Sequence, residues 1–530
     1  MATPIRPAAT LILARPGATE PEVLMLQRSQ SAVFLGGAYV FPGGSLETQD
    51  SDPRLARRVL GLDDAAASKR LDLPSGGIAY WIAAVRECFE EAGVLLASDR
   101  HGNIISAGEA GALLQRRDDS FLELLESEEL YIPGEALAYF GHWITAPGRP
   151  RRFDTRFFLA LAPEGQSGAH DARETVHDVW ISPKEALARA ERGEIELVFA
   201  TQNTLRDLER FRDPRAMFQY ASNLAEIETN RACWAQGAAG PKLFRRADPP
   251  YFEIHWSDPE ETGQTSYDLV AGTPKRLDRL VRRLIAPNPG AMTGPGTNTY
   301  IVGERDLAVI DPGPAIDSHI EKILAETQGR LRWILCTHTH LDHSPAAAAL
   351  KAATGAPLLG RPAPAGQDAS FRPDHALSHN ERLMFDGVTL RAIHTPGHAS
   401  NHLCYLLEQT RMLFTGDHVM QGSTVVINPP DGDMRAYLAS LEMLLAEDIA
   451  IIAPGHGYLI GLPQRELLRE LRNASLEDLL PLVYDDVPSR MHRWAARSLS
   501  AHLDKLVADG EVRPDAGRYA LVESPRRGTQ

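Results

Sequence analysis

Four side chains of metal-binding type lie close together in this 530-residue chain: His338, His340, Asp342 and His343. The largely apolar segment 331–336 before them predicts a buried strand, which puts the cluster on a loop at a strand end. Ligands at positions i and i+2 lie side by side only where the backbone is extended or turning. Imidazole nitrogens with a carboxylate oxygen suit a borderline cation such as zinc. The spacing therefore predicts a metal site.

Three further candidate ligands follow along the chain, each next to a glycine in a turn-forming segment: His398, Asp417 and His456. The glycine lets the backbone come close to an ion. Each pair alone is more often an ordinary turn. Together with the first cluster they make seven candidate ligands, enough for two metal ions that share one carboxylate.

A second group of chemistry-bearing residues lies in the first hundred positions. Three glutamates at positions i, i+3 and i+4 predict three carboxylates on one helix face: Glu87, Glu90 and Glu91. Such like charges repel unless cations hold them, and Mg²⁺ or Mn²⁺ bridging to substrate phosphates would do so. Arg86 is expected to brace the glutamates through a salt bridge. Upstream, Gly43 and Gly44 in Phe-Pro-Gly-Gly supply a glycine-rich opening.

The seven candidate ligands resemble those of the metallo-β-lactamase superfamily, over roughly residues 280 to 465. The resemblance implies an αββα sandwich with a dinuclear site at one edge, holding two Zn²⁺, or Mn²⁺ or Fe²⁺. It implies two ligand sets joined by one bridge: His338, His340 and His398 for one ion, Asp342, His343 and His456 for the other, and Asp417 between them. The implied reaction is hydrolysis, because two close cations lower the pKa of a shared water.

Two aspartates have further expected roles at this site. Asp342 is the candidate to orient the attacking hydroxide as well as to bind metal. Asp311, in Asp-Pro-Gly, is expected to support the ligands from behind, although an ordinary turn is an equal alternative.

The substrate of the metal site depends on the branch of the superfamily. Residues 288–300 and the segment after Asp417 are similar to the lactamase-beta-like group, whose animal members are single-strand endoribonucleases. The resemblance implies phosphodiester cleavage, with single-stranded RNA as the partner. A thioester such as an acyl-glutathione or acyl-coenzyme A is the alternative.

The N-terminal part, about residues 8 to 210, resembles a Nudix hydrolase of the coenzyme A diphosphatase type, on the motifs Val40–Gly44 and Arg86–Leu96. The resemblance implies an α/β/α sandwich that cleaves a nucleoside diphosphate linked to another group. The Nudix box is interrupted, since 42 positions separate Gly44 from Arg86 and Ile78 stands where the pattern, counted back from Arg86, has a glutamate. The interruption leaves open that this half senses a nucleotide without turnover.

The length of 530 residues exceeds what one core usually supports and predicts an α/β multidomain chain. The expected parts are a Nudix-like domain (1–211), a structured connector (212–275), a metallo-β-lactamase domain (276–470) and a winged-helix-like module (471–530). In the last, helical spacing in 476–484 and 491–509 precedes two short strands within 510–521. In the connector, the alternation of Tyr251–Trp256 predicts a strand.

Composition narrows the partners. The formal net charge of −15 argues against a protein that coats nucleic acid or a membrane surface. The four cysteines are scattered without pair spacing, which indicates reduced, buried thiols and a cytoplasmic location. No apolar run approaches the ~18 residues needed to span a bilayer. The expected partners are a nucleotide or coenzyme A-type small molecule and single-stranded RNA; the sequence does not specify the oligomeric state.

Overall fold

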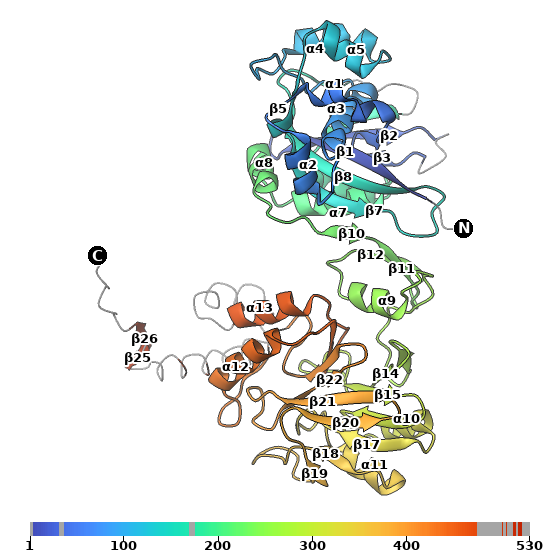
Figure 1. Ribbon diagram of the computed structural model, residues 1–530, viewed down its shortest axis with the longest axis vertical. Helices are drawn as coiled ribbons and strands as arrows, with labels where there is room; N and C mark the ends of the chain where they lie inside the picture. The colour runs from blue at the N-terminus through green and yellow to red at the C-terminus, as the bar shows by residue number, and fades with distance from the viewer. Residues whose placement is uncertain are drawn as a thin grey trace. The chain divides into compact units, whose positions relative to one another are not determined.

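The computed structural model describes residues 4–30, 36–168, 175–423, 425–473, 501, 505, 512–515 and 518–521. The chain divides into two compact units (Figure 1), the first comprising Met1–Trp234 and Leu243–Arg246, the second Ala235–Lys242 and Ala247–Gln530. Residues 212–275, predicted as a connector, are therefore shared between the units. The short strands β11 (Cys233–Ala235) and β12 (Lys242–Phe244) each contain residues of both units.

The first unit contains an eight-stranded mixed sheet. Its strands are β1 (Ile5–Arg15), β2 (Glu22–Arg28), β3 (Tyr39–Val40), β4 (Gly43–Ser45), β7 (Ala138–Ile144), β8 (Arg152–Leu161), β9 (Thr175–Ile181) and β10 (Thr229–Arg231). The order is β10-β7-β8-β1-β2-β3, with β4 paired to β1 and β9 paired to β2. Strand β1 runs parallel to β8 and antiparallel to β2 and β4.

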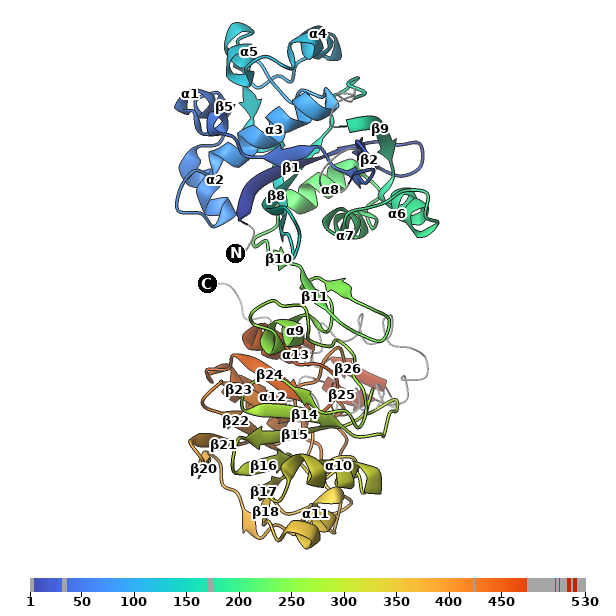
Figure 2. The same ribbon diagram turned by 90° about the vertical axis from the view of Figure 1, so that its right-hand side faces the viewer.

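Strand β1 is buried on both faces, as a central strand of an α/β/α sandwich must be. Leu11 and Leu13 belong to the core that contains Trp81 and Phe89 of helix α3 (Ile78–Ala92). Ile12 and Ala14 point to the opposite core, which is closed by three helices: α6 (Pro183–Glu191), α7 (Phe199–Leu208) and α8 (Pro214–Ser222). This arrangement (Figure 2) confirms the predicted sandwich.

The remaining elements of the first unit are short. Between β4 and α3 lie η1 (Thr48–Ser51), α1 (Pro53–Ala56), β5 (Val59–Leu60) and α2 (Asp64–Leu71). After α3 come α4 (Ala107–Leu113), η2 (Leu114–Arg116), α5 (Phe121–Ser127), β6 (Ile132–Pro133) and η3 (Gly134–Ala136). Helix α3 ends at Gly93, whose φ of +64° is the left-handed conformation that stops a helix.

The second unit contains two sheets that pack face to face. The seven-stranded sheet runs in chain order from β13 to β19: β13 (Lys275–Arg276), β14 (Val281–Ile285), β15 (Asn298–Gly303), β16 (Leu307–Ile310), β17 (Leu331–Leu335), β18 (Leu358–Gly360) and β19 (His375–Ala376). The five-stranded sheet runs from β20 to β24: β20 (Glu381–Phe385), β21 (Val388–His394), β22 (Leu403–Leu407), β23 (Met412–Gly416) and β24 (Ile451–Pro454).

The core between these sheets is apolar from both sides, with Tyr300 and Leu335 from the first sheet and Leu390 and Phe414 from the second. Helices α10 (Asp317–Thr327) and α11 (Ala346–Thr354) close the outer face of the first sheet. Helices α12 (Met434–Leu445) and α13 (Pro463–Asn473) close the outer face of the second. The four layers confirm the predicted αββα sandwich.

Two features of the second unit concern the predicted flanking segments. Tyr251–Ser257 forms helix α9, so the strand predicted at Tyr251–Trp256 is wrong. The three residues Asp248, Pro249 and Pro250 precede it, and the buried Tyr251 and Ile254 lie one helical turn apart on one face. At the C-terminus, β25 (Val512–Asp515) and β26 (Arg518–Leu521) form the predicted antiparallel pair. The predicted helical segments of this module lie almost wholly outside the described residues.

All four cysteines are free and buried, as predicted. Within the described parts of the chain, the helices are too short or too polar to cross a membrane.

Candidate functional sites

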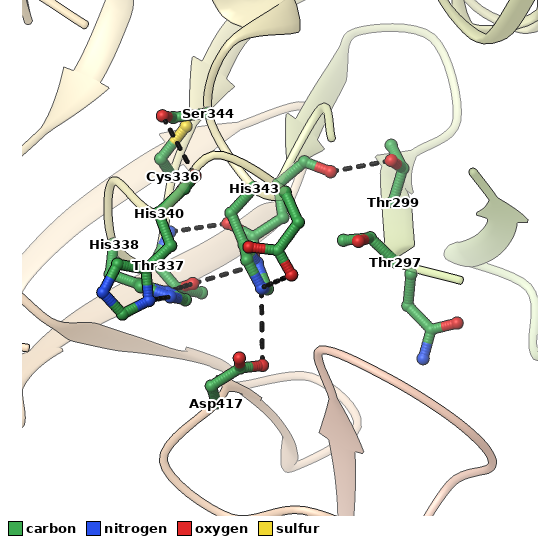
Figure 3. A network of polar contacts seen from close by, with 12 residues as sticks. Thr297, Thr299, Cys336, Thr337, His338, His340, His343, Ser344 and Asp417 are labelled. Carbon is green, nitrogen blue, oxygen red and sulfur yellow. Dashed lines mark hydrogen bonds and ion pairs between the residues drawn. The ribbon is translucent and has the colours of Figure 1, made fainter. Parts of the chain in front are cut away.

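The seven candidate ligands of the second unit converge from the ends of four strands. They follow β17, β21, β23 and β24, and they form two clusters in which the ligand atoms lie within 4.8 Å of one another. One cluster is His338, His340 and His398; the other is Asp342, His343, Asp417 and His456. Figure 3 shows three of the histidines gathered on the β17 loop with Asp417 opposite.

The first cluster consists of three imidazoles whose nitrogens meet. Nδ1 of His340 lies 3.0 Å from Nε2 of His338 and 3.0 Å from Nε2 of His398. His398 donates its Nδ1 proton to the carbonyl of Val426 at 2.7 Å, which leaves its Nε2 as the lone pair. Burial, with the neighbouring His398, lowers the pKa of His340 to about 4. Burial also lowers the pKa of His338, so His338 and His340 are neutral ligands at neutral pH.

The second cluster contains buried polar atoms without hydrogen-bond partners. Nε2 of His343 lies 3.4 Å from Oδ2 of Asp342 and 3.4 Å from Oδ1 of Asp417. Nε2 of His456 lies 3.3 Å and 3.4 Å from the same two oxygens. Both nitrogens and Oδ1 of Asp417 are buried and make no hydrogen bond. Unsatisfied groups of this kind cost about 1–3 kcal/mol each, which a bound cation would remove, so the residues fit a metal site.

The carboxylates of this cluster control its protonation. Burial lowers the pKa of His456, but Asp417 and Asp342 outweigh that effect and raise the pKa to about 9. A cation that binds here competes with this proton.

Asp417 faces both clusters. Its Oδ1 points to His343 and His456, while its Oδ2 lies 3.9 Å from Nε2 of His398. A Cβ at Gly455 would lie 2.4 Å from that Oδ1. A glycine is therefore required beside the bridging position, which explains part of the sequence pattern.

Asp311, just after β16, contacts His343 of one cluster directly and reaches His338 of the other through Thr337. Its Oδ1 accepts from the amide of Thr337 at 2.7 Å, and its Oδ2 accepts from Oγ1 of Thr337 at 2.8 Å and from Nδ1 of His343 at 3.0 Å. Because Oγ1 of Thr337 gives its proton to Asp311, it accepts from Nδ1 of His338, at 3.0 Å. Both histidines thus present Nε2 as the free lone pair.

In the first unit, helix α3 presents Glu87, Glu90 and Glu91 beside the β4 turn. Nη1 of Arg86 pairs with Oε1 of Glu87 at 3.0 Å and with Oε2 of Glu90 at 2.8 Å, as predicted. Glu91 accepts from the amide of Gly43 at 3.0 Å. Burial raises the pKa of Glu87 to about 7 against the opposing effect of Arg86. Among the described residues these three carboxylates do not form a cluster as compact as those of the second unit.

A Cβ at Gly44 would lie 2.5 Å from Oε1 of Glu87, so a larger residue at this position would displace the Glu87 carboxylate. Arg86 has a further partner, Asp50, that the sequence did not predict. Nε and Nη2 of Arg86 bond to the two carboxylate oxygens of Asp50, at 2.8 and 2.9 Å, and both side chains are buried. Counted forward from Gly44, the acidic position of the Nudix pattern falls on Asp50, not on Ile78. The long interruption therefore follows this position.

A cavity of about 1030 Å³ adjoins the three glutamates. Its wall includes four arginines (Arg28, Arg117, Arg149 and Arg151) and five aromatic residues (Phe41, Trp143, Phe153, Phe157 and Phe199). Cationic groups suit phosphates and aromatic rings suit a base or an acyl chain. The cavity has the size of a small-molecule site.

Comparison with known proteins agrees with both architectures. The family model of the metallo-beta-lactamase superfamily matches residues 292–456. A Drosophila melanogaster protein named "Beta-lactamase-like protein 2 homolog" is 30% identical over 274 residues, covering 45% of this chain and 91% of the relative. The chain belongs to the metallo-beta-lactamase superfamily. A protein named "Atrochrysone carboxyl ACP thioesterase" from Aspergillus chevalieri is 35% identical over 258 residues, covering 47% of this chain and 79% of the relative.

The flanking parts of this superfamily member match other families. The model of the NUDT19 Nudix domain matches residues 51–202, and that of the beta-lactamase associated winged helix domain matches residues 475–518. A solved Nudix hydrolase from Alicyclobacillus acidocaldarius has 28% sequence identity, covering 41% of this chain and 96% of that one, with a TM-score of 0.35. The two family models confirm the predicted Nudix and winged-helix domains. With these domains the protein is a metal-dependent hydrolase.

Proposed function

We propose that the metallo-β-lactamase unit hydrolyses a thioester between an acyl group and a pantetheine thiol, as carried by coenzyme A or an acyl carrier protein. The observation that carries the proposal is the ligand set bridged by Asp417, in a chain whose thioesterase-named relatives are aligned over 72% and 79% of their own length. These relatives favour the thioester over the single-stranded RNA predicted first.

The residues of the two clusters would hold two divalent cations. Such cations supply an ionised water at neutral pH and polarise the reacting carbonyl. Asp342, whose side chain is 26% exposed, is more open to solvent than the buried His343 and Asp417. Its carboxylate is therefore the group that orients the attacking water. A thiol of pKa about 8.5 leaves as a thiolate without help from a general acid, which a ribose alkoxide would need.

For the Nudix unit we propose cleavage of the diphosphate of a coenzyme A-type nucleotide. The cavity beside Glu87, Glu90 and Glu91 offers arginines for the phosphates, and these glutamates would bind Mg²⁺ or Mn²⁺. An acyl-coenzyme A contains both scissile bonds, so one small molecule could serve as the substrate of either unit.

The test compares the wild type with His340→Ala and Glu90→Gln on acyl-coenzyme A and on labelled single-stranded RNA. His340→Ala is expected to lose thioester hydrolysis and to retain diphosphate cleavage, and Glu90→Gln is expected to do the reverse. RNA cleavage that disappears in His340→Ala, with no thioester turnover by the wild type, would refute the thioester proposal. A wild type inert on every diphosphate substrate would make the Nudix unit a nucleotide sensor.

A further inference from the structure

A buried carboxylate outside the matched superfamily segment contacts the loop that carries His456. Glu253 lies on helix α9, is fully buried, and accepts four hydrogen bonds. Arg283 donates to its two oxygens at 2.6 and 2.8 Å. Lys275 donates at 2.7 Å and the amide of Leu459 at 3.0 Å. The superfamily match begins at residue 292, so Glu253, Lys275 and Arg283 all precede it.

Arg283 extends the contact to the same loop. It lies on β14, is buried, and its Nη1 also donates to the carbonyl of Gly457 at 3.2 Å. Asn298 donates to the carbonyls of Pro454 and Gly457, both at 3.0 Å. Side chains therefore hold the backbone on both sides of His456. Glu253 bonds directly to Leu459, and it also bonds Arg283, which holds Gly457.

Glu253 supplies the negative charge that balances the cations of this network. Burial raises the pKa of its carboxyl, but Arg283 and Lys275 outweigh that effect and lower the pKa to about 2. One anion thus balances the buried guanidinium of Arg283 and the partly buried ammonium group of Lys275. A buried ion pair is weak evidence for stability, because apolar residues of similar volume often replace it without loss. The hydrogen bonds of this pair to the His456 loop indicate a positioning role instead: the amide of Leu459 donates to Glu253, and Arg283 donates to the carbonyl of Gly457.

We propose that Glu253 is a positioning residue for His456, and through it for the cation held by Asp342, His343 and His456. This inference rests on the proposed metal centre and not on its substrate. Among the described residues, the hydrogen bonds of Glu253 and Arg283 do not reach His338, His340 or His398. The effect of Glu253 is therefore confined to one of the two metal positions.

Glu253→Gln in the full chain tests this proposal by chelator-competition titration with Zn²⁺. The affinity of one of the two ions is expected to fall about 10–100-fold, the range for residues that orient metal ligands, while the other is unchanged. His456→Ala identifies which of the two steps belongs to this position. Glu326→Gln is the matched control, because Glu326 pairs at 2.9 Å with Arg282, the neighbour of Arg283 on β14. Both ions should bind this control normally.

Amide hydrogen exchange of the metal-free protein gives an independent readout. The amides of residues 455–459 should exchange faster in Glu253→Gln than in the wild type. In Glu253→Asp, which keeps the charge on a shorter side chain, the increase should be smaller. Unchanged affinity and unchanged exchange would overturn the proposal. An equal loss of affinity for both ions, together with a lower melting temperature, would also overturn it, because that result indicates a structural role only.

The proposed function can fail separately. A wild type that binds two Zn²⁺ ions but has no thioesterase activity refutes the substrate and leaves the role of Glu253 testable in full. A wild type that binds no Zn²⁺ overturns both.

Discussion

Asp311→Asn tests whether a single carboxylate fixes one histidine in each metal cluster. The substitution keeps the size of the side chain. It also keeps the backbone, because the φ of +51° at this position is left-handed, a conformation that asparagine adopts readily. What changes is hydrogen bonding, since one carboxylate oxygen becomes an NH₂ group that can only donate.

The magnitude follows from the contacts of Asp311. If the remaining carbonyl oxygen keeps the Thr337 amide, the NH₂ group faces two donors, Oγ1 of Thr337 and Nδ1 of His343. Two charge-assisted hydrogen bonds are lost, at about 1.5–3 kcal/mol each, so the free energy of unfolding should fall by about 3–6 kcal/mol. His343 loses the acceptor that fixes its tautomer, and His338 is affected through Thr337, whose Oγ1 loses the acceptor of its own proton. The affinity of each ion should fall about 10–100-fold, or about 1.4–2.7 kcal/mol.

The assay is the same Zn²⁺ competition titration on the full chain, with Asp258→Asn as the matched control. Asp258 is also buried, and it accepts from the amide and Oγ1 of Thr262 and from the amide of Gly263, at 2.7–3.0 Å. None of these groups belongs to either cluster. Asp311→Asn should lower the affinity for both Zn²⁺ ions, and Asp258→Asn should leave both affinities unchanged. Wild-type affinity for both ions in Asp311→Asn, or a loss confined to one of them, would refute this account of the tautomers.

Three further perturbations test other parts of the molecule. Gly455→Ala places a Cβ 2.4 Å from Oδ1 of Asp417, so bound metal measured by elemental analysis should fall for both ions; retention of two ions per chain would contradict the bridge. Asp50→Asn removes one of the two charge-assisted hydrogen bonds between Arg86 and its buried partner, while Glu87 and Glu90 still pair with Arg86, so the unfolding free energy of the Nudix unit should fall by about 1.5–3 kcal/mol and its diphosphatase rate at least tenfold, with thioester hydrolysis unchanged. Burial raises the pKa of Glu470 to about 7, so the stability contributed by its protonated form is complete below pH 4.5 and is lost as the pH rises through about 7. Calorimetry should therefore show Glu470→Gln melting above the wild type at pH 8 and close to it at pH 4.5, and equal melting temperatures at both would count against the shift.

The convergence of the seven candidate ligands was predictable because each of them follows a strand and stands beside a short sequence signal. Strand ends of one sandwich edge meet in space, so local spacing was enough to predict the convergence of His338 and its neighbours with His456, more than a hundred residues away. The glycine beside each ligand was expected to let the backbone come close to an ion; at Gly455 the missing Cβ leaves room for Asp417.

Asp50 was missed for a different reason. The Nudix pattern was counted back from Arg86 across an interruption, and a count in that direction falls on Ile78, which is buried at the start of α3. What the fold requires is an acidic residue that contacts the guanidinium of Arg86, whatever its distance along the sequence. A count forward from Gly44 crosses no insertion and gives Asp50.

Glu253 could not be predicted from the sequence. The alternation of Tyr251–Trp256 predicted a strand with Glu253 on one face, whereas in helix α9 it points to the interior with Tyr251 and Ile254. A carboxylate in an apolar segment is stable inside a protein only if cations reach it, and its partners Lys275 and Arg283 come from β13 and β14, 22 and 30 residues further along the chain. Ligands are recognisable from their own neighbours, but residues that hold a ligand loop are defined by contacts between distant segments. If Glu253 positions His456, then metal loading of this unit depends on the segment that precedes the matched domain.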